Sequence, residues 1–286
     1  MWPDTPLPPE EPAGQNPPDG AIINYYLKSD AKNVTLEILD NAGTVLRKYS
    51  SQDQPYAIPE VNIPLYWIRP QQILSARAGS HRFLWDIRLT PLDVEPSYPI
   101  SATYMNTAPE ATAPWLMPGT YQVKLTVDGN VQTQSLTVRM DPRVTTSTAD
   151  LQLQYDLASK CYNARKSVVA AVKEIQSIRS QVGDRKASAK GTVIKSLDDA
   201  DQQLQKLARF SWGSSDPTLG WLDFSLASLF STLEDADLPP TAQAKAAVGQ
   251  LEGEYNRLMP TWKQWKEKSL PALNAQLKKS GLKAIQ

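Results

Sequence analysis

The stretch PGTYQVKLTVDGNVQTQSLTVRMDPRV, residues 118–144, contains the boundary between two kinds of secondary structure. Apolar and polar residues alternate on both sides of Asp128-Gly129, a dipeptide typical of two-residue hairpin turns. After Asp141-Pro142-Arg143, the apolar residues recur at every third or fourth position instead. This change of period from two to 3.6 predicts strands before the boundary and helices after it.

Proline is distributed unevenly about the same boundary. Eighteen of the 23 prolines fall in residues 1–143, and the other five fall in residues 144–286. Because proline is excluded from helix interiors and central strands, this distribution favours strands and loops first and helices second. We therefore predict an all-β domain followed by an all-α domain. The expected parts are a proline-rich linker over 1–20, a β-sandwich over 21–143 and a helical bundle over 144–286.

Toward the N-terminus the same alternation marks further short strands. The segments VTLEILD, residues 34–40, and TVLRKY, residues 44–49, flank a predicted turn. In HRFLWDIRL, residues 81–89, the odd positions are apolar except for His81. Six or seven such strands within about 120 residues predict an antiparallel β-sandwich of the immunoglobulin (Ig) or fibronectin type.

Four amphipathic stripes follow the boundary. Ser147 and Asp150 resemble a capping box at the start of the first helix, and Gly183 is expected to end that helix. Asp216, directly before a proline, is expected to cap the third helix, and Pro260 to kink the fourth. Amphipathic helices joined by short breaks predict an antiparallel bundle of about four helices.

Composition argues against several classes of protein. Lys+Arg and Asp+Glu number 30 each, so there is no electrostatic reason to expect nucleic acid or an anionic membrane surface as a partner. No apolar run approaches the ~20 residues that cross a bilayer, and no signal peptide is visible. One histidine, one cysteine and the lack of a phosphate-binding glycine-rich loop give no indication of a metal ion or another cofactor.

Two proline-interrupted segments, residues 54–79 and 90–117, are too long for ordinary hairpin loops and carry the candidate binding residues. Flat Tyr and Trp side chains bury much apolar area, either on a sugar ring or at a protein interface. The candidates are Tyr66, Trp67, Tyr98, Tyr104 and Trp115. The sequence leaves open whether these side chains bind protein or carbohydrate, or close the ends of the sandwich.

Residues with catalytic potential have structural explanations as well. His81 is either a general base or a half-buried strand residue, and no nucleophile is identified beside it. Cys161 lies inside the first helical stripe, which favours core packing over a reactive thiolate. A glycosidase works with two carboxylates, and Asp86, Asp93 and Glu95 flank the second long loop. A solvated surface role is the simpler explanation for each of these carboxylates, so no catalytic residue is predicted.

Several motifs together resemble a known family. NPPDGAIINYYL, VTLEILDNAGTVLRKY, HRFLWDIRL and PGTYQVKLTVDG are similar to the C-terminal region of bacterial sortilin-like, BNR-repeat propeller proteins, often labelled glycosyl hydrolases. The β-part also resembles the Ig-like domain of flagellar hook-capping proteins. The helical stretch DLQLQYDLASKCYNAR, residues 150–165, is similar to the segment that follows in the propeller proteins.

The resemblance implies a non-catalytic accessory or scaffolding region that contacts an upstream β-propeller or another protein. It also implies export to the periplasm or beyond. No catalytic position of the family can be transferred, because the propeller would precede residue 16. Two alternatives stay open: a carbohydrate-binding module that assists a glycosidase on polysaccharide, and a glycoside hydrolase centred on Asp86, Asp93 or Glu95.

Overall fold

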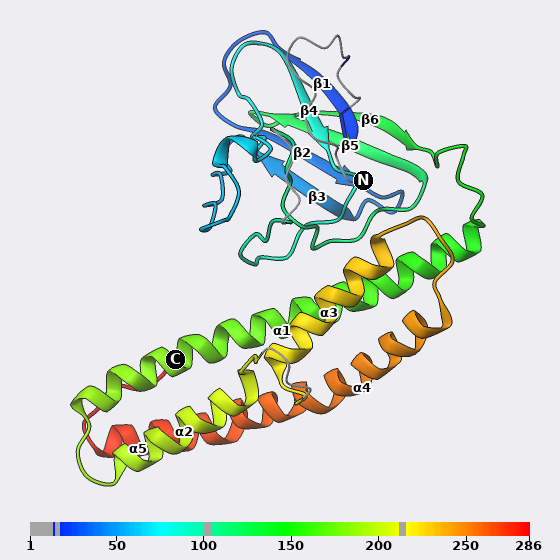
Figure 1. Ribbon diagram of the computed structural model, residues 1–286. Coiled ribbons are helices and arrows are strands. Elements are labelled where there is room, and N and C mark those ends of the chain that lie inside the picture. Colours follow the sequence, from blue (N-terminus) through cyan, green and yellow to red (C-terminus); the bar gives the residue numbers. More distant parts are fainter. Residues whose placement is uncertain (1–13, 15–17, 100–104, 212–215) are drawn as a thin grey trace. The chain divides into compact units, whose positions relative to one another are not determined.

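The computed structural model describes residue 14 and residues 18–99, 105–211 and 216–286. The chain divides into two compact units, Met1–Thr145 and Thr146–Gln286, which are treated separately below. The first unit contains only strands and one short 3-10 helix among its described residues, and the second contains only helices (Figure 1). The predicted order of β structure followed by α structure is thus confirmed.

Six strands are present in the described part of the first unit, and all of their pairings are antiparallel. They form a two-stranded sheet of order β1-β4 and a four-stranded sheet of order β3-β2-β5-β6. The 3-10 helix η1 spans Leu65–Trp67. The strands are β1 (Ala21–Leu27), β2 (Val34–Leu39), β3 (Val45–Ser50), β4 (Gly79–Trp85), β5 (Gly119–Val127) and β6 (Asn130–Val138).

The core of this unit follows from the alternation in the sequence. Val34, Leu36 and Ile38 are fully buried on one face of β2, because alternate residues of a strand point to the same side. Side chains of the small sheet pack on those of the large one. The ring of Trp85 on β4 meets that of Tyr121 on β5 edge-on, with centroids 5.9 Å apart.

The hairpin quoted at the outset folds as its turn residues predict. Asp128 and Gly129 both have positive φ values, 47° and 89°, which is the conformation of a two-residue type I′ turn. The Asp128 carboxylate also accepts hydrogen bonds from the backbone N–H groups of Lys32 and Asn33. The turn therefore joins β5 to β6 and at the same time ties down the chain that enters β2.

The second unit is built from two long helical stretches and two short helices. Its common core contains, among others, Cys161, Leu197, Leu222 and Trp262. The helix α4 continues through a π-helical turn, η2, directly into α5. The elements are α1 (Thr148–Ser188), α2 (Val193–Ala208), α3 (Leu219–Glu234), α4 (Ala242–Gln264), η2 (Trp265–Ser269) and α5 (Leu270–Lys279). Among the described residues, no helix is both long enough and apolar enough to cross a bilayer.

Ion pairs give the direction of α2 and α3 along α1. Proceeding backward along α1, Lys186 pairs with Asp198 at 2.5 Å, Arg179 with Asp201 at 2.7 Å, and Arg165 with Asp223 at 2.8 Å. Hence α2 and α3 lie one after the other along α1, and both run antiparallel to it (Figure 1).

The stretch that contains α4 and η2 runs the other way. Lys160 pairs with Glu252 at 3.0 Å, and Glu174, about four turns further along α1, pairs with Lys266 at 2.6 Å. This stretch is therefore parallel to α1, and α2 and α3 together form a single return path. A strict up-and-down alternation of four helices does not describe the unit, because α2 and α3 point in the same direction.

Four expectations about helix ends can now be assessed. Ser147 is the N-cap of α1, as predicted, and its hydroxyl accepts a hydrogen bond from the Asp150 N–H. Gly183 does not end α1, which continues to Ser188. Thr218 caps α3 in place of Asp216. Pro260 lies inside α4, and the hydrogen-bond pattern changes to a π-turn five residues later.

Candidate functional site

The two long loops of the strand unit meet through their backbones. The N–H of Thr107 donates to the carbonyl of Trp67 at 3.1 Å, and the N–H of Arg69 donates to the carbonyl of Thr107 at 2.8 Å. Ile68 and Thr107 form an isolated parallel bridge, and both residues are buried. The candidate residues of loop 54–79 are thus held against the start of the described part of loop 105–117.

Large apolar side chains stand exposed around this junction. Tyr66 is 67% exposed and Leu65 is 64% exposed, both on η1, and Met105 on the facing loop is 51% exposed. Tyr56 joins them through its loop, because Gln71 accepts from the Tyr56 N–H and donates to its carbonyl, each at 2.9 Å. We call Tyr56, Leu65, Tyr66 and Met105 the loop patch.

The predicted candidates occupy different positions relative to the loop patch. Tyr66 is its most exposed member, whereas the adjacent Trp67 is half-buried. The phenol of Tyr98 donates to that of Tyr56 at 3.4 Å, which places Tyr98 at the border of the patch. Tyr104 lies outside the described residues. The sequence-based prediction missed Tyr56, and it missed Leu65 and Met105 because it considered only aromatic side chains.

Trp115 lies elsewhere, because the second loop folds back on itself. The Leu89 N–H donates to the carbonyl of Pro114 at 3.2 Å, and the Glu110 N–H donates to the carbonyl of Ser97 at 2.8 Å. Trp115 is therefore at the base of the loop and Tyr98 near its far end. The Trp115 ring is 43% exposed, and the guanidinium of Arg88 sits 4.0 Å from its centroid.

The carboxylate candidates differ in their surroundings. Asp86 is half-buried at the end of β4, and its Oδ1 accepts from the Arg88 N–H at 3.4 Å. Burial raises the pKa of Asp86, and the positive charge of Arg47 opposes that rise. Asp93 and Glu95, in contrast, are exposed on the loop.

His81 is engaged in the strand structure. Its Nε2 lies 2.6 Å from the carbonyl oxygen of Arg77, and its ring stands 5.0 Å from that of Tyr25. Because a carbonyl can only accept, Nε2 must carry the proton in this contact. This contact and the neighbouring Tyr25 ring hold His81 in place within the strand structure.

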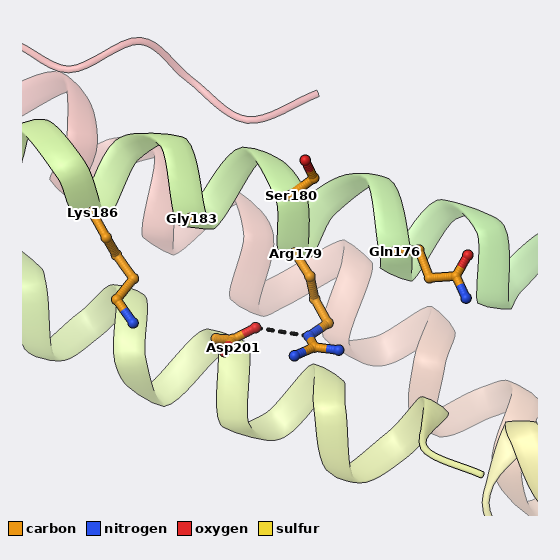
Figure 2. Close-up of a pocket in the computed structure, with 6 residues that line it drawn as sticks. All are labelled: Gln176, Arg179, Ser180, Gly183, Lys186 and Asp201. Carbon is orange, nitrogen blue, oxygen red and sulfur yellow. Dashed lines mark hydrogen bonds and ion pairs between the residues drawn. The ribbon is translucent and has the colours of Figure 1, made fainter.

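A hollow on the described part of the helical unit is lined mainly by polar and charged residues. Figure 2 shows this hollow, of about 400 Å³, between α1 and α2, lined by Gln176, Arg179, Ser180, Gly183, Lys186 and Asp201. Its charges neutralise each other, since Arg179 binds Asp201 and Lys186 binds Asp198. Within the described residues, no group of three or more His, Cys, Asp or Glu side chains is placed to hold a metal ion.

Cys161 is packed in the helical core, with only 1% of its surface exposed. Burial, together with the smaller effect of the nearby Glu252 carboxylate, raises the pKa of its thiol to about 12. We predict that a thiol reagent such as 5,5′-dithiobis(2-nitrobenzoate) will not modify the native chain at pH 8 and will modify it fully in urea. Reaction of the native chain at the rate of the urea-unfolded chain would contradict this placement.

Asp86 and Glu37 predict opposite effects of pH on stability. The pKa of Asp86 is higher in the folded chain than in the unfolded chain. Its contribution to folding stability is therefore fully present below the unfolded-state pKa and is lost as pH rises through the folded-state pKa. The Lys124 ammonium lowers the pKa of Glu37, so the Glu37 contribution exists above the unfolded pKa and is lost as pH falls through the folded pKa.

The two carboxyl groups can be compared by neutral substitution. At neutral pH we expect Asp86→Asn to raise the free energy of unfolding and Glu37→Gln to lower it. Near about pH 3 the Asp86 difference should vanish, because that carboxyl group is then largely protonated in both states, and the Glu37 difference should be smaller than at neutral pH, because its lowered folded pKa is being approached. Urea unfolding at the two pH values measures this. Equal effects of either substitution at both pH values would show that its carboxyl charge is not responsible.

Comparison with known proteins adds no assignment: no protein-family model matches the chain, and no curated protein sequence matches it either.

Proposed function

We propose that this chain is a non-catalytic accessory region of an exported propeller protein, in which the loop patch contacts the propeller or another protein. The two sheets, whose side chains pack on each other, support an Ig-like sandwich for the first unit. The shared apolar core of α1 to α5 supports a helical bundle for the second. The resemblance of the sequence motifs supplies the propeller and the export to the periplasm or beyond.

The observation that carries the proposal is the loop patch itself. Tyr66, Leu65 and Met105 expose most of their apolar side chains on segments fixed by backbone hydrogen bonds. Contiguous apolar groups on a surface commonly mark protein–protein contacts, and Tyr and Met are enriched there. Since residues 67–69 and Thr107 already pair with each other, a partner would bind these described parts of the loops without much loss of conformational entropy.

The contacts between its helices suit the helical unit to a bracing role. Ion pairs between neighbouring helices link α1 to α2, α3 and α4, and the apolar residues lie between the helices. The tail after α5 is fastened back on α1, where Arg185 donates to the carbonyl of Lys283 at 2.9 Å. A long element tied along its whole length suits a spacer better than a mobile binding arm.

Carbohydrate binding is the second candidate, and Trp115 is the observation in its favour. The Arg88 guanidinium, which also donates to the carbonyl of Ala113 at 2.7 Å, fixes one face of the indole ring. A tryptophan held flat with part of its surface open is suited to stacking on a sugar ring. One such ring gives little affinity, since oligosaccharide sites combine several contacts.

Affinity electrophoresis in gels that contain soluble polysaccharides separates the two candidates. The proposal predicts that a panel of neutral and acidic polysaccharides will not retard the chain. The variants Trp115→Ala and Tyr66→Ala serve as matched probes of the two aromatic positions. Retardation that Trp115→Ala abolishes and Tyr66→Ala preserves would replace the scaffolding proposal with a carbohydrate-binding module.

A further inference from the structure

Strand β6 is an exposed edge of the four-stranded sheet. It spans nine residues, NVQTQSLTV, in unbroken register with β5, and its first six residues are exposed on both faces. It contains no charged residue and no proline, the two devices that most often protect edge strands from pairing. Nothing in the described residues hydrogen-bonds to its outer side.

The opposite edge of the same sheet is protected. Strand β3 carries Arg47 and Lys48, and its register with β2 is interrupted by a bulge. The carbonyl of Leu46 on β3 accepts hydrogen bonds from the N–H and the hydroxyl of Thr90. The contrast shows that, among the described residues, one edge of this sheet is covered by a loop of the chain and the β6 edge is open.

The turn conformation tells which backbone groups of β6 point outward. In a two-residue type I′ hairpin, Val127 and Asn130 exchange hydrogen bonds across the turn, and the hydrogen-bonded pairs then alternate along the ladder. The N–H and C=O groups of alternate residues therefore face away from β5. These outward residues are Val131, Thr133, Ser135 and Thr137.

We propose that β6 pairs with β6 of a second copy of this chain, antiparallel and about a two-fold axis at Gln134, to give a continuous eight-stranded sheet. In this register Val131 lies opposite Thr137 of the second copy, and Thr133 lies opposite Ser135. All four outward residues are then hydrogen-bonded. Gln134 faces itself across the axis as a non-hydrogen-bonded pair, so all nine residues of β6 are paired.

Charges at the two ends of β6 favour a second copy in this antiparallel orientation. Asp128 precedes the strand and the exposed Arg139 follows it. Antiparallel pairing brings Arg139 of each copy beside the turn that holds Asp128 of the other, whereas parallel pairing would bring like charges together. One pair of strand edges buries less surface than a stable dimer interface, so we expect a Kd of about 0.1 mM.

Cysteine pairing in the full chain tests the register. Gln134→Cys introduces one cysteine per copy, and the Cα atoms of the two cysteines lie about 4.5 Å apart across the axis. This separation is within the range of a disulfide. Gln132→Cys, on the same face of the same strand, places its two thiols about 13 Å apart. The buried Cys161 is silent in both variants. We expect mild oxidation to give a disulfide-linked dimer for Gln134→Cys and several-fold less for Gln132→Cys.

Sedimentation velocity supplies the second readout without crosslinking. The unmodified chain is expected to sediment faster as its concentration approaches about 0.1 mM. Gln134→Lys, which sets like charges against each other on the axis, should remain monomeric. An equimolar mixture with Gln134→Glu should dimerise again. Equal crosslinking of the two cysteine variants, or a monomeric unmodified chain at that concentration, would overturn the proposal.

Discussion

Replacement of Gly20 by alanine is expected to destabilise the strand unit by about 3–5 kcal/mol. Gly20 has φ +126°, a conformation that other residues rarely adopt. An added Cβ would lie 2.3 Å from the carbonyl oxygen of Trp85, an approach that backbone atoms cannot relieve locally. Since Ala21 pairs with Trp85 at the start of β1, the clash would separate β1 from β4.

Gly79 provides the matched control for this effect. It has a similar positive φ of +117°, but an added Cβ would meet nothing within 4 Å. Gly79→Ala should therefore show only the conformational cost, about 1–2 kcal/mol. Hydrogen–deuterium exchange of peptides that cover β1 and β4 measures both changes in the full chain. If these peptides were as well protected from exchange in the Gly20→Ala variant as in the Gly79→Ala variant, the close approach to Trp85 would be disproved.

The second large effect is expected at Gly220, where the start of α3 crosses the end of α2. A Cβ there would lie 2.6 Å from the carbonyl oxygen of Ala208 and 2.7 Å from that of Arg209. The hydroxyl of Thr218 donates to the same Arg209 carbonyl, which holds the two segments together. We expect Gly220→Ala to lower the free energy of unfolding of the helical unit by about 2–3 kcal/mol.

The same substitution at Gly183 should have the opposite sign. Gly183 is exposed in the interior of α1, and an added Cβ would contact nothing within 4 Å. Alanine there should stabilise the helix by about 0.5–1 kcal/mol, because it restricts the unfolded chain and favours helix. Urea unfolding followed by circular dichroism at the helical band compares the two variants. A loss of stability at both positions, or at neither, would contradict the described packing.

The elements themselves could be predicted because their residues repeat with a clear period. The alternation around Asp128-Gly129 gave both strands of the hairpin, and Ser147 gave the start of α1. The end of α1 could not be predicted from Gly183. A glycine inside a helix costs only about 1 kcal/mol, which the burial of Ile178 and Val182 against α2 outweighs. Thr218 was missed as the cap because Asp216 stands directly before a proline; the Thr218 hydroxyl accepts from the Trp221 N–H and also donates to the carbonyl of Arg209 just after α2, a contact that leaves no pattern in the sequence.

The candidate site was less accessible to sequence reasoning. The aromatic residues drew attention to the two long loops. The pairing of these loops, however, rests on backbone contacts between Trp67 and Thr107, and such contacts leave no pattern in the sequence. The separation of Trp115 from Tyr66 likewise depends on how the second loop folds back. Ile87 at the end of β4 has φ +56°, a conformation that no β-branched residue favours and no local signal predicts.

The most direct test of the scaffolding account is site-specific photocrosslinking at the loop patch. p-Benzoylphenylalanine at Tyr66 should yield, in cells that produce the full-length protein, peptides crosslinked to a propeller or to another protein. The same group at Tyr26 on β1, which is 65% exposed against 67% for Tyr66, should yield none. Adducts at Tyr66 that are absent or no more frequent than at Tyr26 would contradict the account.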